Sequence, residues 1–76
     1  MISNEEIAIL HIIYKRLIIK KSELINLSKE IANGALEKPL DVLKDNGYID
    51  ILSPVGETTI AITQKGMKLV SENPNV

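Results

Sequence analysis

The sequence contains no cysteine, tryptophan or phenylalanine, and two tyrosines are the only aromatic residues among its 76 positions. Without cysteine there is no disulfide, no thiolate metal ligand and no thiol nucleophile. Two rings are too few for a surface that stacks the bases of single-stranded nucleic acid. Burial of aliphatic side chains and hydrogen bonding must therefore hold the fold together.

The sequence also has no large excess of positive or negative charge, because nine basic residues stand against ten acidic ones and the net charge is −1. Contact with nucleic acid would therefore need a local cluster of basic side chains. No apolar run approaches the roughly 18 residues of a membrane span, and the first residues, MISNEEIAIL, carry two acids where a signal peptide carries positive charge. We expect a cytoplasmic protein.

The sequence shows no motif for catalysis, because no nucleophile with a base, no group of metal ligands and no cofactor-binding pattern is visible. We expect a protein that is not an enzyme and that holds no cofactor or metal. A chain of this length buries only about 60% of its unfolded surface, so every apolar element must contribute to one core. We therefore expect a single domain over residues 1–76.

A capping signal precedes the first helical pattern. Ser3 and Asn4 are good cap residues, and Glu5 and Glu6 place negative charge where a helix N-terminus favours it. The spacing predicts a helix from about residue 4 to 17. Its apolar stripe comprises Ile7, Leu10, Tyr14 and Leu17, with Ile9 and Ile13 widening it and Ile12 on the otherwise polar side.

Two short elements follow this helix. The β-branched run at residues 17–19 is too short for a helix and predicts a brief edge strand. Ser22 is expected to cap a second helix, with Ile31 packing beyond its end. A turn is expected at Asn33–Gly34.

A third helix is indicated by leucines at positions 36, 40 and 43, and it ends at Asn46–Gly47, a favourable left-handed stop. Pro39 leaves two starting points open. Proline costs little in the first turn and about 3 kcal/mol or more deeper in a helix. The helix therefore begins near Glu37 or Lys38, or it begins near Asn33 and bends.

The hydrophobic period changes to two after residue 47. Residues 48–52 and 59–62 predict two strands, and the segment 53–57 closes a hairpin between them. Thr63 is expected to cap a last helix, followed by a polar tail from about residue 71. The predicted core comprises Ile7, Leu10, Tyr14, Leu17, Leu24, Leu27, Ile31, Leu36, Leu40, Leu43, Ile49, Ile51, Ile60, Ile62 and Val70.

The order of elements is thus helix, short strand, helix, turn, helix, hairpin, helix. This order predicts an α+β fold of the winged-helix type, with a helix-turn-helix core of three helices, a β-hairpin wing and a short C-terminal helix. The hairpin closes the core from one side, because a helix-turn-helix pair alone is too small to bury its apolar faces.

The stretch SELINLSKEIANGALEKPLDVLKDNGYI, followed by a hairpin and ITQKGMKLV, resembles the MarR-type and related prokaryotic winged-helix regulators. Their pattern includes an LxxLxxxGyI helix end, a wing and an LTxxG start of the last helix. The matching positions are Leu40, Leu43, Gly47, Tyr48, Ile49, Ile62, Thr63 and Gly66. The resemblance covers about residues 7 to 70 and implies a small DNA-binding protein that regulates transcription.

The resemblance also implies a binding site for double-stranded DNA. The third helix would lie in a major groove, and the positions facing base edges would be Asn33, Ala35, Glu37, Lys38 and Asp41. The residues themselves suggest a phosphate contact at the start of the second helix, because helix N-termini attract anions and lysines add charge. That contact would use Lys20, Lys21 and Ser22, within a basic cluster that also contains Lys15 and Arg16.

A second class of function stays open, a winged helix that acts as a protein-interaction module in a larger assembly. Glu37 and Asp41 would repel phosphate, and the hairpin segment SPVGET has no Arg or Lys to reach a minor groove. We also expect self-association as a homodimer, which would pair two copies on two half-sites of DNA. Its interface would be the apolar excess of the first helix, at Ile9, Ile12 and Ile13.

Overall fold

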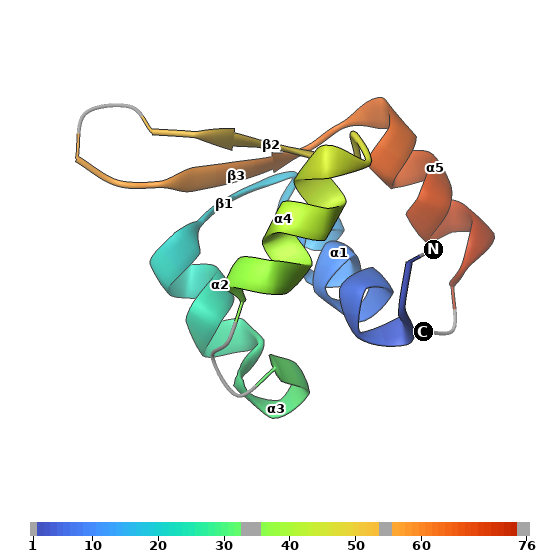
Figure 1. Cartoon of the computed structure of the whole chain (residues 1–76), viewed down its shortest axis with the longest axis horizontal. Coiled ribbons are helices and arrows are strands. Elements are labelled where there is room, and N and C mark those ends of the chain that lie inside the picture. Colours follow the sequence, from blue (N-terminus) through green and yellow to red (C-terminus); the bar gives the residue numbers. More distant parts are fainter. Residues whose placement is uncertain (1, 33–35, 54–55, 75–76) are drawn as a thin grey trace.

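The computed structural model describes residues 2–32, 36–53 and 56–74, and within these ranges it has an α+β fold of five helices and a three-stranded antiparallel sheet (Figure 1). The elements are α1 (Asn4–Arg16), β1 (Ile18–Lys20), α2 (Lys21–Leu27), α3 (Lys29–Ala32), α4 (Glu37–Asp45), β2 (Ile49–Leu52), β3 (Thr59–Ile62) and α5 (Gln64–Glu72). None of the described helices combines the length and the apolarity needed to cross a membrane.

The sheet has the strand order β1-β3-β2, so β3 lies in the centre and pairs antiparallel with both neighbours. Its register places Ile49 opposite Ile62, and Ile51 opposite Ile60. Residues directly opposite each other share a face of the sheet. These four isoleucines therefore face the helices together, as the two-residue period predicted, and all except the partly buried Ile51 are buried.

Helix α1 occupies the middle of the molecule, where it packs against α4, α5 and β3. Three of its residues, Ile9, Leu10 and Ile13, have no exposed surface. The remaining buried core is formed by Ile7, Ile19, Leu24, Leu36, Leu40, Leu43, Ile49, Ile60, Ile62 and Val70. Ile31, predicted as core, is only partly buried and packs against this cluster.

Three residues predicted in the core are exposed instead: Tyr14 by 41%, Leu17 by 54% and Leu27 by 47%. Because α1 is enclosed by neighbours on several sides, its buried face is centred on Ile9 and Ile13 rather than on the predicted stripe. Leu17 also lies beyond the last residue of α1. It has a φ of 65° and a ψ of −40°, a strained conformation for a branched side chain.

The helix starts follow local chemistry in two cases. Ser3 caps α1, because its hydroxyl accepts from the Glu6 N–H at 3.2 Å while the Glu6 carboxylate accepts from the Ser3 N–H at 2.9 Å. Helix α4 begins at Glu37, so Pro39 lies in its first turn and the first of the two predicted starting points is confirmed. The predicted turn at Asn33–Gly34 lies outside the described residues.

Helix α2 begins earlier than its predicted cap. Lys20 is the N-cap residue and makes no side-chain capping bond, so the prediction that Ser22 caps the helix was wrong. The start is set by the sheet, because the backbone N–H of Lys21 donates to the Thr58 carbonyl at 2.9 Å. This bond holds the first residue of α2 beside the entry to β3.

The end of α4 and the start of α5 are joined by a set of hydrogen bonds that we call the clasp. Gly47 ends the α4 segment with a φ of 78°, as predicted. The Thr63 hydroxyl donates to the Gly47 carbonyl at 2.6 Å and accepts from the Gly66 N–H at 3.1 Å. The Thr63 N–H donates to the Tyr48 carbonyl at 3.1 Å. Thr63 therefore caps α5, as predicted, and also ties it to the start of the hairpin.

Candidate nucleic-acid interface

Two structural elements carry the residues predicted to contact DNA, the start of α2 and the exposed face of α4. Both lie beside the hairpin of β2 and β3, which extends to one side of the molecule, whereas α5 lies at the opposite end (Figure 1). This arrangement brings Lys20, Lys21 and Ser22 to the same side as the hairpin. Asn33 and Ala35, predicted to face base edges, lie outside the described residues.

An acidic side chain of the hairpin lies against the predicted phosphate contact. The Ser22 hydroxyl donates to Glu57 Oε1 at 2.7 Å, and the Lys20 ammonium is 4.0 Å from Glu57 Oε2. A phosphate at this position would replace Glu57 as the partner of these side chains. The side chains of Lys20 and Glu57 are 62% and 47% exposed, so their ion pair contributes little to stability and can be exchanged.

The role of Glu57 was missed from the sequence, because it depends on the pairing of two distant strands. The β1–β3 register pairs Lys20 with Thr59, and continuing it by two residues places Ser22 opposite Glu57. The pairing of a three-residue strand with a distant strand is difficult to predict, because its short apolar run specifies neither partner nor register.

The remaining basic residues near α2 form a separate surface contact. Arg16 and Glu23 make an ion pair at 2.7 Å, with about half of each side chain exposed. Exposed pairs of this kind contribute at most about 1 kcal/mol, so Arg16 could exchange Glu23 for a phosphate at small cost. Lys15 is exposed.

The outer face of α4 carries both signs of charge. Glu37, Lys38, Asp41, Lys44 and Asp45 are all exposed. Three acids and two lysines along a helix of nine residues give no net attraction for phosphate. Any contact of α4 with a duplex would therefore depend on Lys38 and Lys44 reaching phosphates or bases while the acids face solvent or cytosine amino groups.

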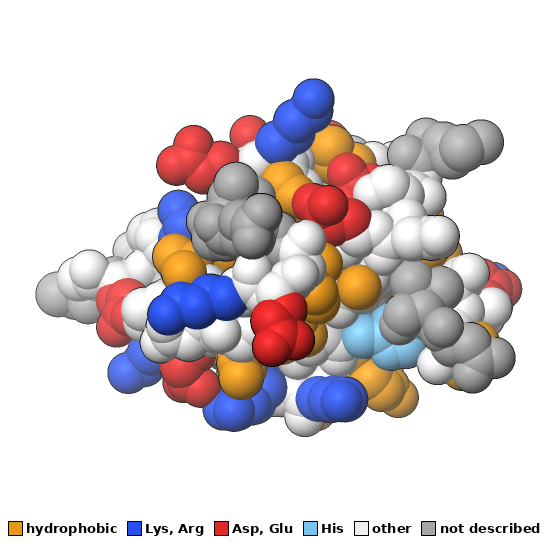
Figure 2. Space-filling view, turned by 90° about the horizontal axis from the view of Figure 1, so that it is seen from below, with side chains coloured by type: hydrophobic (Ala, Val, Ile, Leu, Met, Phe, Trp, Pro, Cys, Tyr) orange, Lys and Arg blue, Asp and Glu red, His pale blue; other side chains and the backbone are white. Residues whose placement is uncertain are grey.

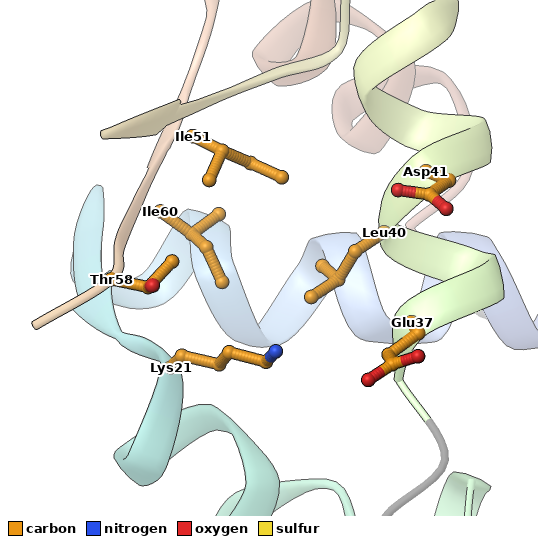
Figure 3. Close-up of a pocket in the computed structure, with 7 residues that line it drawn as sticks. All are labelled: Lys21, Glu37, Leu40, Asp41, Ile51, Thr58 and Ile60. Carbon is orange, nitrogen blue, oxygen red and sulfur yellow. The ribbon is translucent and has the colours of Figure 1, made fainter. Parts of the chain in front are cut away.

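A groove separates α4 from the hairpin and the start of α2, and we call it the α4–hairpin groove (Figure 3). It encloses about 200 Å³ and is lined by Lys21, Glu37, Leu40, Asp41, Ile51, Thr58 and Ile60. Lys21 is partly buried, and its side chain extends from α2 toward Glu37 on α4 (Figure 3). Of the residues predicted to bind DNA, the structure therefore brings Lys21, Glu37 and Asp41 together around one groove.

The wider surface also mixes side chains of different kinds. Figure 2 shows the molecule from below the view of Figure 1, the side on which α3 lies, and acidic, basic and apolar side chains alternate over the described part of that face. This face offers no broad basic surface for a polyanion. A duplex bound to the described part of this face would contact individual basic side chains among acidic and apolar ones.

The predicted dimer interface on α1 is corrected by the packing of this helix. Ile9 and Ile13 are fully buried within the chain, so neither can contact a second copy. Ile12 is partly buried and packs against the same core. Helix α1 is covered by α4, α5 and β3, so its additional apolar side chains pack inside the chain rather than against a second copy.

Comparisons with known proteins found no match to this chain among family models, curated proteins or solved structures.

Proposed function

We propose that this chain is a winged-helix protein that binds double-stranded DNA and acts as a small transcriptional regulator. The fold is inferred from the order of elements. Helices α2 and α4 supply the helix-turn-helix, the hairpin of β2 and β3 follows α4 after three residues, and β1 completes the sheet. In this fold α4 is the helix presented to a major groove, and the hairpin is the wing.

The observation that supports the proposal is the position of the lysines. Lys20 is the N-cap residue of α2 and Lys38 lies on α4, the elements that a winged helix presents to a duplex, and both side chains are exposed. The only partner of Lys20 in the described structure is the weakly paired Glu57. Each lysine can therefore contact a phosphate at little cost.

The salt dependence of binding tests the proposal. With about four phosphate contacts per protomer, the logarithm of the association constant should fall against the logarithm of salt concentration with a slope of about −3.6. Lys20→Ala and Lys38→Ala should each make that slope shallower by up to about 0.9. Lys68→Ala removes the same charge from α5, at the far end of the molecule, and should leave the slope unchanged.

The measurement is fluorescence anisotropy with labelled genomic and random duplexes, starting at about 50 mM salt, where non-specific contacts are strong. Equal slopes for Lys20→Ala, Lys38→Ala and Lys68→Ala would show that α2 and α4 do not face the duplex. No binding at low salt would end the DNA-binding proposal for this chain.

A second candidate function, a protein-interaction module, is favoured by one observation. Glu57 engages the side chains of Lys20 and Ser22, which places an acid where a phosphate would have to bind. A surface evolved for phosphate has no need of this acid. A surface that contacts another protein can use it to order the hairpin against α2.

Glu57→Gln separates the two functions. For a DNA-binding protein, removing this negative charge should raise the affinity for a duplex by roughly two- to tenfold, because Lys20 and Ser22 then lose a competing anion. Glu72→Gln, at the end of α5, removes the same charge away from α2 and serves as the control. Affinity that stays the same or falls in Glu57→Gln would favour the protein-interaction module.

A further inference from the structure

The α4–hairpin groove has opposite charges on its two walls and an apolar floor. The ammonium of Lys21 enters from α2, whereas the carboxylates of Glu37 and Asp41 project from α4 on the other wall (Figure 3). The floor is formed by Leu40, which is 4% exposed, together with side chains of β2 and β3. The groove thus combines both signs of charge with apolar surface, contributed by α2, α4 and the hairpin.

No ion pair within 4.0 Å joins Lys21 to the carboxylates of the groove in the described part of the chain. Within residues 2–32, 36–53 and 56–74, the ion pairs within 4.0 Å are Arg16–Glu23 and Lys20–Glu57, and Lys21 belongs to neither. Glu37 and Asp41 are four residues apart on α4, a spacing at which like charges destabilise a helix. The groove therefore presents one cation and two anions that lack partners within the described chain.

From this geometry we propose that the α4–hairpin groove binds a small zwitterion with an aliphatic body, that is, an α-amino acid with an apolar side chain. The carboxylate of the ligand would pair with the Lys21 ammonium and its amino group with Glu37 or Asp41. Its side chain would lie against the partly buried Ile51, beside Leu40 and Ile60, which are already almost fully buried. Nothing in this inference depends on the protein binding DNA.

Both charges of the ligand are needed, which decides between ligand classes. A simple amine would meet the carboxylates of α4 but would bring a second cation close to Lys21. A simple carboxylate would pair with Lys21 but would face Glu37 and Asp41. A zwitterion meets both walls with opposite charge, and an aliphatic side chain adds the burial of apolar surface.

The size of the groove sets the size of the ligand and its affinity. A volume of about 200 Å³ is below the roughly 300–1,000 Å³ of pockets that bind drug-sized molecules. It suits a molecule as small as one amino acid. So few atoms in an open groove should bind with a dissociation constant on the order of millimolar.

The first experiment uses the unmodified protein and three related probes. Methyl signals of Leu40, Ile51 and Ile60 are followed by NMR during titration with L-leucine, with isocaproate, which lacks the amino group, and with isoamylamine, which lacks the carboxylate. L-Leucine should cause saturable shifts at these methyls. The other two probes should bind at least about tenfold more weakly than L-leucine. Equal binding of either analogue, shifts elsewhere in the chain, or no saturation would overturn the proposal.

The second experiment assigns the charges. Lys21→Met and the double variant Glu37→Gln with Asp41→Asn should each weaken L-leucine binding about tenfold, and unchanged binding in either would overturn the proposal. Lys44→Met and Asp45→Asn change the same charges on α4 at residues that do not line the groove, and they should bind L-leucine as the unmodified protein does. Amide spectra confirm that each variant is folded. Equal weakening by the control pair would show a general charge effect and would overturn the assignment.

Discussion

The Gly66→Ala variant is expected to lose about 3 kcal/mol or more of its free energy of unfolding. A Cβ at this position would collide with the backbone carbonyl oxygen of Tyr48 and would lie 2.8 Å from Cγ1 of Ile62. The carbonyl cannot easily move away, because it accepts a hydrogen bond from the Thr63 N–H within the clasp. The added methyl group must therefore push α5 away from the start of the hairpin.

This expectation has the opposite sign to the usual rule for helices. Alanine in place of glycine normally stabilises a helix by about 1 kcal/mol, and Gly66 lies within α5. A domain of this size has a total stability of only about 4–11 kcal/mol, so a loss of 3 kcal/mol is a large fraction of it. Even a small gain in stability would show that α5 does not approach Tyr48 as described.

Urea denaturation followed by circular dichroism measures the effect. Lys68→Ala, an exposed position of the same helix, is the control and should change the free energy of unfolding by less than about 0.5 kcal/mol. If both variants lose equal stability, the loss comes from α5 in general and the contact between Gly66 and Tyr48 is not its cause.

The second large effect is expected at Leu24, and Leu27 provides a matched control on the same helix. Both leucines were predicted in the core, but Leu24 is fully buried and Leu27 is 47% exposed. Leu24→Ala should cost about 2–5 kcal/mol, because it removes buried methyl groups and leaves a cavity. Leu27→Ala should cost less than about 1 kcal/mol, since about half of this residue already contacts water.

The two leucine variants are compared by urea denaturation under the same conditions. A difference of at least about 1 kcal/mol between them is expected, with Leu24→Ala the less stable. Similar losses would mean that α2 is rotated about its axis and buries both residues. A larger loss of stability for Leu27→Ala would show that α2 buries the face that carries Leu27.

Local features of the sequence were enough to predict the elements that depend on neighbouring residues. Ser3 and Thr63 cap their helices because a hydroxyl can reach a backbone N–H three residues later. Gly47 ends the α4 segment because it adopts a positive φ at little cost. The alternation through residues 49–52 and 59–62 places the isoleucines on one face whatever the helices do, since successive strand residues point to opposite sides.

Only the tertiary structure decided which apolar residues are buried where an element offers more than one apolar face. Helix α1 carries apolar residues around much of its circumference, so its periodicity alone could not distinguish Ile9 and Ile13 from Tyr14 and Leu17. The choice depends on α4, α5 and β3, which pack against α1 from distant parts of the chain. The same explanation holds for Leu27 on α2.

The sequence predicted which elements carry the candidate site, but it did not predict which residues of the site contact each other. The sequence placed Lys20 and Lys21 just ahead of a helix capped by Ser22, whereas the contact with the sheet starts that helix at Lys21. Glu57 contacts Lys20 and Ser22 only because β1 pairs with β3, and the α4–hairpin groove forms only when α2, α4 and the hairpin come together. Residues 35 or more positions from Ser22 carry no local signal of proximity to it, so long-range packing had to decide these contacts.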